Sequence, residues 1–222
     1  MEKIEFLQKN LSFWNRLTKT EQHLLEQNAI EKSFCKGEVL HNSSEGCLGM
    51  VLVKSGQIRA YLLSEDGREI TLMRLFQGDI CVLSASCILD AITFEVSIDA
   101  EEDSQVVILP SNLMHQLMEQ NIHVENFTYQ LIAASFSDVM WTMQQILFMS
   151  FDKRLAIFLL DEVAKNHSDA LKITHEQIAK YMGSAREVVS RMLKYFEGEG
   201  IVALSRGGIQ VLDKKKLKGL LN

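Results

Sequence analysis

Two arginines, a glutamate and a serine lie within one short stretch, REVVSR, in the C-terminal part of the chain. These residues are Arg186, Glu187, Ser190 and Arg191, and helical spacing would place all four on the same side of a helix. Arginine can hold guanine O6 and N7 with two hydrogen bonds, and glutamate can accept one from the cytosine amino group. The spacing therefore predicts a helix that reads base edges in DNA, with Ser190 adding a hydroxyl contact.

The surrounding sequence, residues 173–194, predicts two short helices separated at Gly183. Thr174 and Gln177 have the spacing of a capping box, and so do Ser184 and Glu187, so each helix carries a start signal. A glycine between two helices is typical of a helix-turn-helix. The alternative is an ordinary helical hairpin with surface charge. The expected apolar face consists of Ile178 and Met182 on the first helix and Val188, Val189, Met192, Leu193 and Phe196 on the second.

A β-hairpin is expected directly after the second helix. Its strands would be residues 201–204 and 209–212, joined by Ser205-Arg206-Gly207-Gly208. A hairpin in this place is the wing of a winged helix-turn-helix, and Arg206 would lie at its tip. We expect phosphate contacts from two polar pairs that flank the base-reading helix: Thr174 with His175, and Ser205 with Arg206.

The run GSAREVVSRMLKYFEGEGIV resembles the C-terminal domain of the cyclic AMP receptor protein/fumarate-nitrate regulator (CRP/FNR) superfamily of bacterial transcription factors. The resemblance implies a homodimer that binds a palindromic operator in double-stranded DNA, with a TGA-like core in each half-site. RNA polymerase is a further candidate partner. If Glu187 closes a capping box on Ser184, it has less freedom to reach a cytosine.

Charge is divided unevenly along the chain. Residues 1–149 contain ten Lys and Arg against 20 Asp and Glu, a net charge of −10, whereas residues 150–222 contain 13 against nine, a net charge of +4. This division favours phosphate contact by the C-terminal part alone. No apolar run approaches the roughly 18 residues of a membrane span, and we expect a cytoplasmic protein without a membrane partner. No nucleophile–base pair or phosphate loop indicates an enzyme.

The N-terminal half predicts a β-rich domain. Residues 1–31 favour short amphipathic helices, and short strands separated by glycine turns follow from Phe34. The pattern KGEVL, VKSGQI, SEDGREITL and QGDI resembles the cyclic-nucleotide-binding β-roll, a jelly roll. Its turn glycines are Gly37, Gly56, Gly67 and Gly78, where a positive φ is expected. The expected strands are residues 39–41, 50–53, 58–62, 69–73, 94–98 and 106–109.

After Pro110 a long helical tract is expected, with a break at 149–151 where Ser150 can cap the next helix. Its apolar residues recur at alternating spacings of three and four, as in a heptad seam. Either this seam packs inside the monomer or it pairs with a second copy, which a palindrome-reading dimer favours. The predicted dimer interface consists of Tyr129, Ile132, Phe136, Val139, Met143 and Ile146.

The expected fold is therefore α+β, in three parts. Residues 1–110 would form an effector-sensing β-roll, residues 111–149 a dimerisation helix, and residues 150–222 the winged helix-turn-helix. In nucleotide-binding relatives the β-roll carries a Gly-Glu and an Arg-Ser that hold the cyclic phosphate. Neither pair is present here, and no Lys or Arg occurs from Ile80 to Ile98. A buried phosphate needs a cationic partner, so we predict that neither cyclic AMP nor cyclic GMP binds tightly.

The sequence does not identify the effector. Cys81 with Cys87, or Cys35 with Cys47, would suit a metal ion or a redox disulfide, although free cysteines often only pack in a core. Haem held by His41, His115 or His123 is a further alternative, as is a ligand-binding β-roll protein that does not contact DNA. Our default is no cofactor and an unknown small effector. Its expected pocket is lined by Cys81, Ser84, Cys87, Phe94, Tyr129 and Met140.

Overall fold

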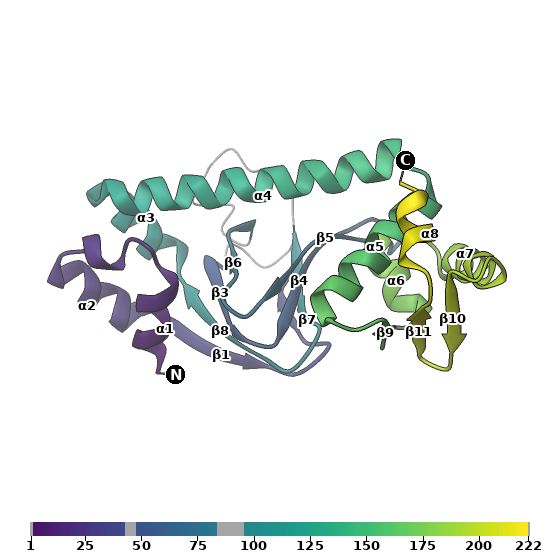
Figure 1. The fold of residues 1–222 in the computed structure, drawn as a ribbon. Helices are drawn as coiled ribbons and strands as arrows, with labels where there is room; N and C mark the ends of the chain where they lie inside the picture. Colours follow the sequence, from purple (N-terminus) through teal and green to yellow (C-terminus); the bar gives the residue numbers. More distant parts are fainter. Residues whose placement is uncertain (1, 43–47, 84–95, 222) are drawn as a thin grey trace. The chain divides into compact units, whose positions relative to one another are not determined.

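Figure 1 shows the computed structural model of the chain, in which residues 2–42, 48–83 and 96–221 are described. The chain forms two compact units. The first unit comprises Met1–Leu63 and Leu72–Met140, and the second comprises Ser64–Thr71 and Trp141–Asn222. The mixed α+β class expected from the sequence is confirmed.

The chain begins with helices, as expected: α1 (Lys3–Asn10), the 3-10 helix η1 (Trp14–Arg16) and α2 (Lys19–Asn28). They bury Phe6, Leu7 and Trp14 in an apolar cluster of the first unit. The helical expectation for the end of this stretch was wrong, because Ile30–Phe34 forms strand β1 and pairs antiparallel with β8 (Ser104–Leu109). Pairing with a strand some 70 residues away is a tertiary effect that a local pattern does not contain.

Two four-stranded sheets form the β-roll of the first unit. One has the order β1-β8-β3-β6 and the other β2-β7-β4-β5. The strands expected at 39–41, 50–53, 58–62, 69–73 and 106–109 are confirmed, and the turn glycines have positive φ; of the strand expected at 94–98, only Ser97 and Ile98 lie in a strand and Val96 does not. Phe94 and Glu95, the start of one expected strand, lie outside the described residues. The remaining strand bounds are β2 (Val39–His41), β3 (Met50–Ser55), β4 (Gln57–Leu63), β5 (Glu69–Phe76), β6 (Ile80–Cys81) and β7 (Ser97–Ala100).

Strand β3 is buried on both faces, which explains why its sequence is continuously apolar rather than alternating. Met50 and Leu52 pack with the N-terminal helices, whereas Val51 and Val53 pack between the two sheets. Strand β8 divides its apolar residues between the same two clusters. The sheet β1-β8-β3-β6 is thus the middle layer of the first unit.

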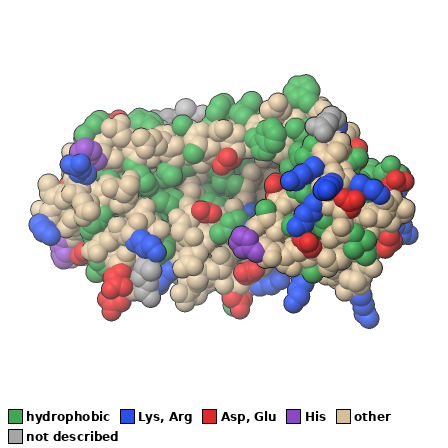
Figure 2. Space-filling model, viewed as in Figure 1, with side chains coloured by type: hydrophobic (Ala, Val, Ile, Leu, Met, Phe, Trp, Pro, Cys, Tyr) green, Lys and Arg blue, Asp and Glu red, His purple; other side chains and the backbone are tan. Residues whose placement is uncertain are grey.

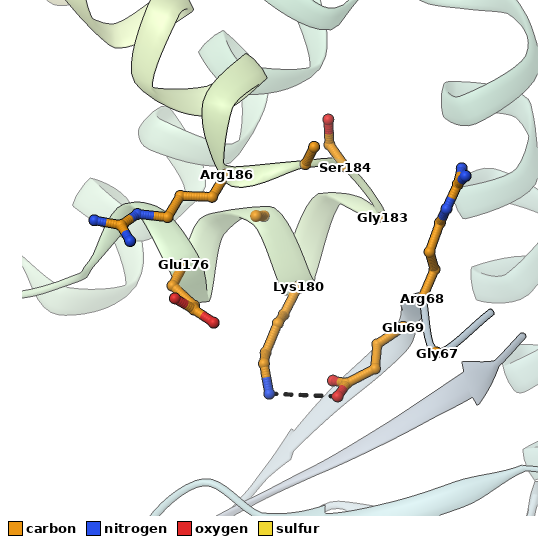
Figure 3. A pocket seen from close by; sticks show the side chains of 10 residues that line it. Gly67, Arg68, Glu69, Glu176, Lys180, Gly183, Ser184 and Arg186 are labelled. Atoms are coloured by element: carbon orange, nitrogen blue, oxygen red, sulfur yellow. Dashed lines mark hydrogen bonds and ion pairs between the residues drawn. The ribbon is translucent and has the colours of Figure 1, made fainter.

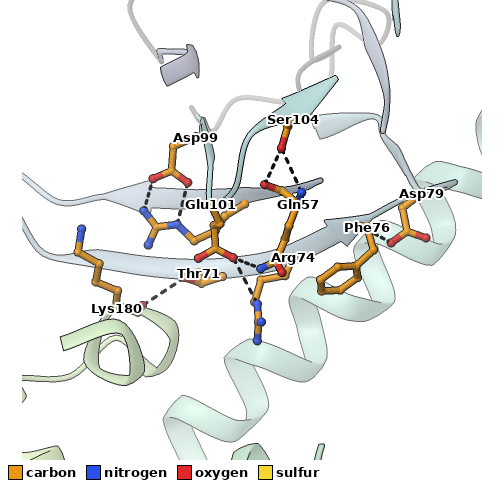
Figure 4. Close-up of polar contacts among 10 residues, drawn as sticks. Gln57, Thr71, Arg74, Phe76, Asp79, Asp99, Glu101, Ser104 and Lys180 are labelled. Carbon is orange, nitrogen blue, oxygen red and sulfur yellow. Dashed lines mark hydrogen bonds and ion pairs between the residues drawn. The ribbon is translucent and has the colours of Figure 1, made fainter. Parts of the chain in front are cut away.

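The second sheet carries paired charges across its strands (Figure 4). Arg59 on β4 lies directly opposite Asp99 on β7, and its Nε donates to Asp99 Oδ1 at 3.0 Å. The Nε of Arg74 on β5 lies 3.4 Å from Glu101 Oε2, and Gln57 also donates to this carboxylate. Because Arg59 is almost fully buried, its charge requires this partner.

The helical tract after β8 consists of α3 (Ser111–Gln120) and α4 (Ile122–Phe148). The break expected at 149–151 is present, since the next helix, α5, spans Phe151–Asn166. Ser150 occupies the N-cap position, but its side chain accepts no backbone hydrogen bond there, so the expected cap is wrong. A hydrogen bond from Ser150 instead lowers the pKa of the Asp152 carboxyl group.

One side of α4 exposes a continuous apolar stripe, which we call the α4 stripe. Phe136 is 66% exposed and Phe148, at the end of the helix, is 81% exposed. Ile132 and Val139 are instead partly buried against the core of the first unit. Apolar side chains gather along α4 on the face shown in Figure 2. The α4 stripe consists of Tyr129, Phe136, Met140, Met143 and Leu147.

The second unit surrounds an apolar cluster of its own. It includes α6 (His175–Met182), α7 (Arg186–Gly198) and a three-stranded sheet of order β10-β11-β9. The strands are β9 (Ala170–Leu171), β10 (Val202–Ser205) and β11 (Gly208–Val211), and α8 (Lys214–Gly219) follows. Of the apolar face expected on the two short helices, Ile178, Met182, Val189, Leu193 and Phe196 are buried in this cluster, Met192 packs against it partly buried, and Val188 is only half-buried.

Candidate nucleic-acid interface

The turn between α6 and α7 is a three-residue connection that begins at Gly183. This glycine ends α6 with φ of +58°, the left-handed conformation that glycine adopts most easily. The backbone N–H of Ser184 donates to the carbonyl of Ala179 at 2.9 Å, which closes a Schellman motif. Because Ser184 belongs to this turn, the N-cap of α7 is Ala185 and no side chain caps the helix. The capping box expected from Ser184 and Glu187 is therefore wrong.

The start of α6 agrees with the sequence. Thr174 is the N-cap, its hydroxyl accepts from the backbone of Gln177, and Gln177 accepts from the backbone N–H of Thr174 at 2.9 Å. The same glutamine oxygen accepts the Thr174 hydroxyl hydrogen at 3.0 Å. This capping box is complete, and the next residue, His175, contacts Ser190 on α7.

Two neighbouring hollows of the surface bring the expected DNA-contacting residues together. The first is lined by the start of α6, by Arg186 and by the wing residues Ser205, Gly207 and Gly208. The second is lined by Arg186, Glu187, Ser190, Arg191 and Lys194. Arg186 lines both hollows and joins them into one surface. This interface surface contains every residue expected to contact DNA except Arg206.

Arg206 lies at the tip of the wing. The pairing of Ser205 with Gly208 leaves Arg206 and Gly207 as the two turn residues, and Gly207 has φ of +78°. The Ser205 hydroxyl donates to the Gly208 carbonyl at 3.2 Å, so it is already engaged within the turn. Arg206 is exposed, and its charge is free to reach along a duplex.

His175 and Ser190 contact each other across the two helices. His175 Nδ1 lies 2.8 Å from Ser190 Oγ, and both residues are half-buried. Burial, followed by the positive charges of Arg186 and Lys194, holds the pKa of the His175 imidazole below its usual value. The ring is therefore neutral near pH 7, where its Nδ1 can act as a donor or as an acceptor.

Lys194 also lines the interface surface but is not among the residues predicted from the sequence, although its spacing indicates the same face of the helix. It follows Ser190 and Arg191 by four and three residues, so it lies on the same side of α7 one turn later. Lys and Arg side chains gather over the second unit in the view of Figure 2. The interface surface thus combines Arg186, Arg191 and Lys194 with two acidic side chains, Glu176 on α6 and Glu187 on α7.

Lys180, on α6, is already paired with a carboxylate. Its Nζ lies 3.3 Å from Glu69 Oε1, in the segment Ser64–Thr71 that belongs to the second unit (Figure 3). The Thr71 hydroxyl also donates to the backbone carbonyl of Lys180 at 3.2 Å. We therefore leave Lys180 out of the interface surface. An ion pair this exposed contributes little to stability.

The residues expected around an effector are only partly described. Cys81 is fully buried between the two sheets of the first unit, whereas Tyr129 and Met140 are exposed on α4. Ser84, Cys87 and Phe94 lie outside the described residues, as does Cys47. Cys35 is exposed. The pocket that would unite the six lining residues stays a prediction.

Among the described residues, no group of three or more His, Cys, Asp or Glu side chains has the arrangement of a metal site. His41 lies on β2, His115 on α3 and His123 on α4. Over the same part of the chain, no helix has the length and apolar character needed to cross a membrane.

Comparison with known proteins agrees with both units. The family model for the cyclic nucleotide-binding domain matches residues 31–121, and the model for the Crp-like helix-turn-helix domain matches residues 153–220. The crystal structure of a protein from Eubacterium rectale, described as a transcriptional regulator of the crp/fnr family, superposes with a TM-score of 0.90. It is 48% identical, over 96% of this chain and 99% of that one.

Curated proteins are similar over most of the chain as well. The transcriptional activator Anr of Pseudomonas aeruginosa is 24% identical over 83% of this chain and 78% of its own length. The cyclic AMP receptor protein of Thermus thermophilus is 27% identical over 78% of this chain and 81% of its own.

A β-roll followed by a long helix and a winged helix-turn-helix defines a DNA-binding transcription regulator. The identity and coverage of the Eubacterium rectale structure make the family explicit. The chain belongs to the Crp/Fnr family of transcription regulators.

Proposed function

We propose that this regulator binds a palindromic operator as a homodimer and that it answers to an effector or redox signal other than cyclic AMP. The observation that carries the proposal is the interface surface, in which Arg186, Glu187, Ser190 and Arg191 line one hollow on α7. In this proposal Arg186, Glu187 and Arg191 contact base edges, and Ser190 adds a hydroxyl contact. Thr174, His175, Ser205 and Arg206 position phosphates.

Glu187 is available for a base contact because it does not cap α7. A carboxylate at this position would accept a hydrogen bond from a cytosine amino group. Together with the two arginines, it supports the half-site with a TGA-like core that the resemblance implies.

The α4 stripe supports dimerisation. Large apolar side chains such as Phe136 lose contact with water when a second copy covers them, and a twofold axis brings identical stripes together. Of the predicted dimer contacts, Tyr129, Phe136, Met143 and Ile146 are exposed, whereas Ile132 and Val139 face the core of their own chain. Pairing through α4 would set the two copies of α7 on half-sites about 34 Å apart, one turn of DNA.

The effector would act by binding one arrangement of the dimer more tightly than another, because only differential affinity shifts such an equilibrium. The absence of Lys and Arg from Ile80 to Ile98 supports a signal that is not a cyclic phosphodiester. Thiol chemistry at Cys81 with Cys87 remains the alternative input, and an absorption spectrum of the purified protein separates haem or a cluster from a colourless effector.

The test is selection of duplex fragments by the full-length protein, followed by footprinting with and without reductant, with the mass of the free protein measured by light scattering. We expect a dimer that protects two half-sites about one helical turn apart. A strictly monomeric protein that binds all duplexes equally at low salt would refute the proposal.

A further inference from the structure

The contact between His175 and Ser190 joins two residues that would otherwise meet DNA independently. They lie 15 residues apart, on α6 and α7, and their polar atoms are 2.8 Å apart. Ser190 also lines the hollow formed by Arg186, Glu187, Arg191 and Lys194. The Ser190 hydroxyl therefore has one side towards the imidazole and another towards the surface that would receive the bases.

A serine hydroxyl has a single hydrogen, so this contact limits what Ser190 can offer to DNA. When His175 Nδ1 carries no proton, it accepts the hydroxyl hydrogen, and only the oxygen lone pairs of Ser190 face outward. When Nδ1 carries a proton, it donates to Ser190 Oγ, and the hydroxyl hydrogen is free to point towards DNA. Ser190 is an acceptor in the first state and a donor in the second.

Among the described residues, the charged groups near His175 are Arg186 and Lys194 on α7 and Glu176 on α6, which lines the same hollow as His175. The wing residues that line this hollow, Ser205, Gly207 and Gly208, carry no charge. Burial and then the two cations lower the pKa of the His175 ring, so the imidazolium form is populated only at acidic pH.

We propose that His175 is a positioning residue for Ser190: its neutral ring carries the hydrogen on Nε2 and leaves Ser190 an acceptor, and protonation of Nδ1 switches Ser190 from acceptor to donor at the base edge. The inference rests on the proposed base-reading role of α7. A hydroxyl acceptor suits the amino groups of adenine and cytosine, whereas a donor suits guanine O6 and N7 or thymine O4. The operator preference of the protein therefore depends on pH at the base pair that Ser190 faces.

The DNA experiment uses the full-length protein and operator duplexes that carry each of the four base pairs at every half-site position. The variants are Ser190→Ala, which removes the hydroxyl, and His175→Asn, which keeps a hydrogen-bonding amide near the Nδ1 position but does not titrate. For the wild type, we expect the affinity ratio between duplexes at one position to change about threefold to tenfold between about pH 5.5 and about pH 8, the effect of one hydrogen bond.

Both variants should give a ratio at that position that is independent of pH. A wild-type ratio that does not change with pH, or an unchanged pH effect in Ser190→Ala, would overturn the inference alone. A wild type that does not discriminate among duplexes would overturn the proposed function, and with it the reading role of Ser190.

A second measurement needs no DNA. Long-range proton–nitrogen spectra of histidine-labelled protein report the tautomer and the titration of His175. We expect Ser190→Ala to change the Nδ1 signal of His175 and its titration midpoint, while Ser205→Ala, on the wing side of the same hollow, leaves both nearly unchanged. Identical His175 spectra in the wild type and Ser190→Ala would contradict the coupling directly.

Discussion

Arg154 Nη1 donates a hydrogen bond to the backbone carbonyl of Met182 at 3.1 Å. Met182 is the last residue of α6, where carbonyl groups have no partner within the helix. A cation at this end of a helix also meets the negative end of the helix dipole. Arg154 thereby ties α5 to the end of α6 just before the Gly183 turn, and the orientation of α7 depends on that turn.

Replacing Arg154 with methionine removes this hydrogen bond while retaining most of the apolar volume. We expect Arg154→Met to lower the free energy of unfolding by about 1–3 kcal/mol, as for the loss of a hydrogen bond to a charged group. Denaturant unfolding followed by circular dichroism measures this change. The matched control is Arg206→Met at the exposed wing tip, which should stay within about 0.5 kcal/mol of the wild type. Equal midpoints for the two variants would contradict the anchoring role.

Arg191 and Lys194 lie on the same hollow but should contribute differently to DNA binding. We expect Arg191→Ala to weaken binding to the selected operator by about 1–3 kcal/mol and to have little effect on a scrambled duplex, as for a base contact. Lys194→Ala should weaken binding to both duplexes by a similar factor, as for a phosphate contact. Fluorescence anisotropy at a fixed salt concentration measures both. An equal loss on the two duplexes for Arg191→Ala would remove Arg191 from the base-reading set.

The α4 stripe should fail to pair when a charge is placed at its centre. We expect Phe136→Glu to shift the protein from dimer to monomer, because two buried carboxylates would face each other across the twofold axis. Analytical ultracentrifugation measures the change. Ser137→Glu, one position along the exposed surface of the same helix, carries the same charge and should remain dimeric. A dimer of unchanged strength in Phe136→Glu would show that the copies associate elsewhere.

The β-roll should tolerate an added methyl group at one turn glycine and not at another. Gly37 and Gly56 have similar φ angles, +85° and +80°, but a Cβ on Gly56 would lie 2.4 Å from Ser104 Oγ, whereas nothing lies within 4 Å of one on Gly37. Gly37→Ala should cost about 1–2 kcal/mol, the strain of the left-handed region alone. Gly56→Ala should lower the free energy of unfolding by clearly more than Gly37→Ala does. Thermal unfolding of the two variants measures both costs. Equal costs would mean that β4 and β8 separate freely at this turn.

Calorimetric titration of the full-length protein with cyclic AMP or cyclic GMP should give no micromolar heat signal. The segment from Ile80 to Ile98 contains no Lys or Arg that could neutralise the phosphate. The titration tests the prediction only when the protein sample is folded and binds its selected operator. A micromolar signal under those conditions would refute the exclusion of cyclic nucleotides.

The sequence was sufficient to predict features that depend only on neighbouring residues. The turns at Gly37, Gly56, Gly67 and Gly78 were predicted because a positive φ favours glycine whatever lies around it. The Thr174–Gln177 capping box depends only on residues three positions apart. The helix-turn-helix and its wing follow from such signals in series.

Contacts between distant residues decided the rest. Ser184 has the spacing of a helix cap, but the Schellman turn at the end of α6 takes its backbone N–H, and α7 begins later. Likewise, heptad spacing marks both Ile132 and Phe136 as apolar seam positions, yet only packing against the core of the first unit makes Ile132 partly buried and leaves Phe136 exposed.

The amino-acid sequence by itself indicated two short helices followed by a hairpin, because periodicity, the Thr174–Gln177 cap and turn glycines act over a few neighbouring residues, and the resemblance of its motifs pointed to the family. The tertiary structure decided which apolar side of α4 remains free and that His175 meets Ser190, since each depends on which distant surfaces come within contact. Hydrogen bonds and packing contacts act over only a few ångströms, so contacts between residues distant in the sequence form only when the chain has folded.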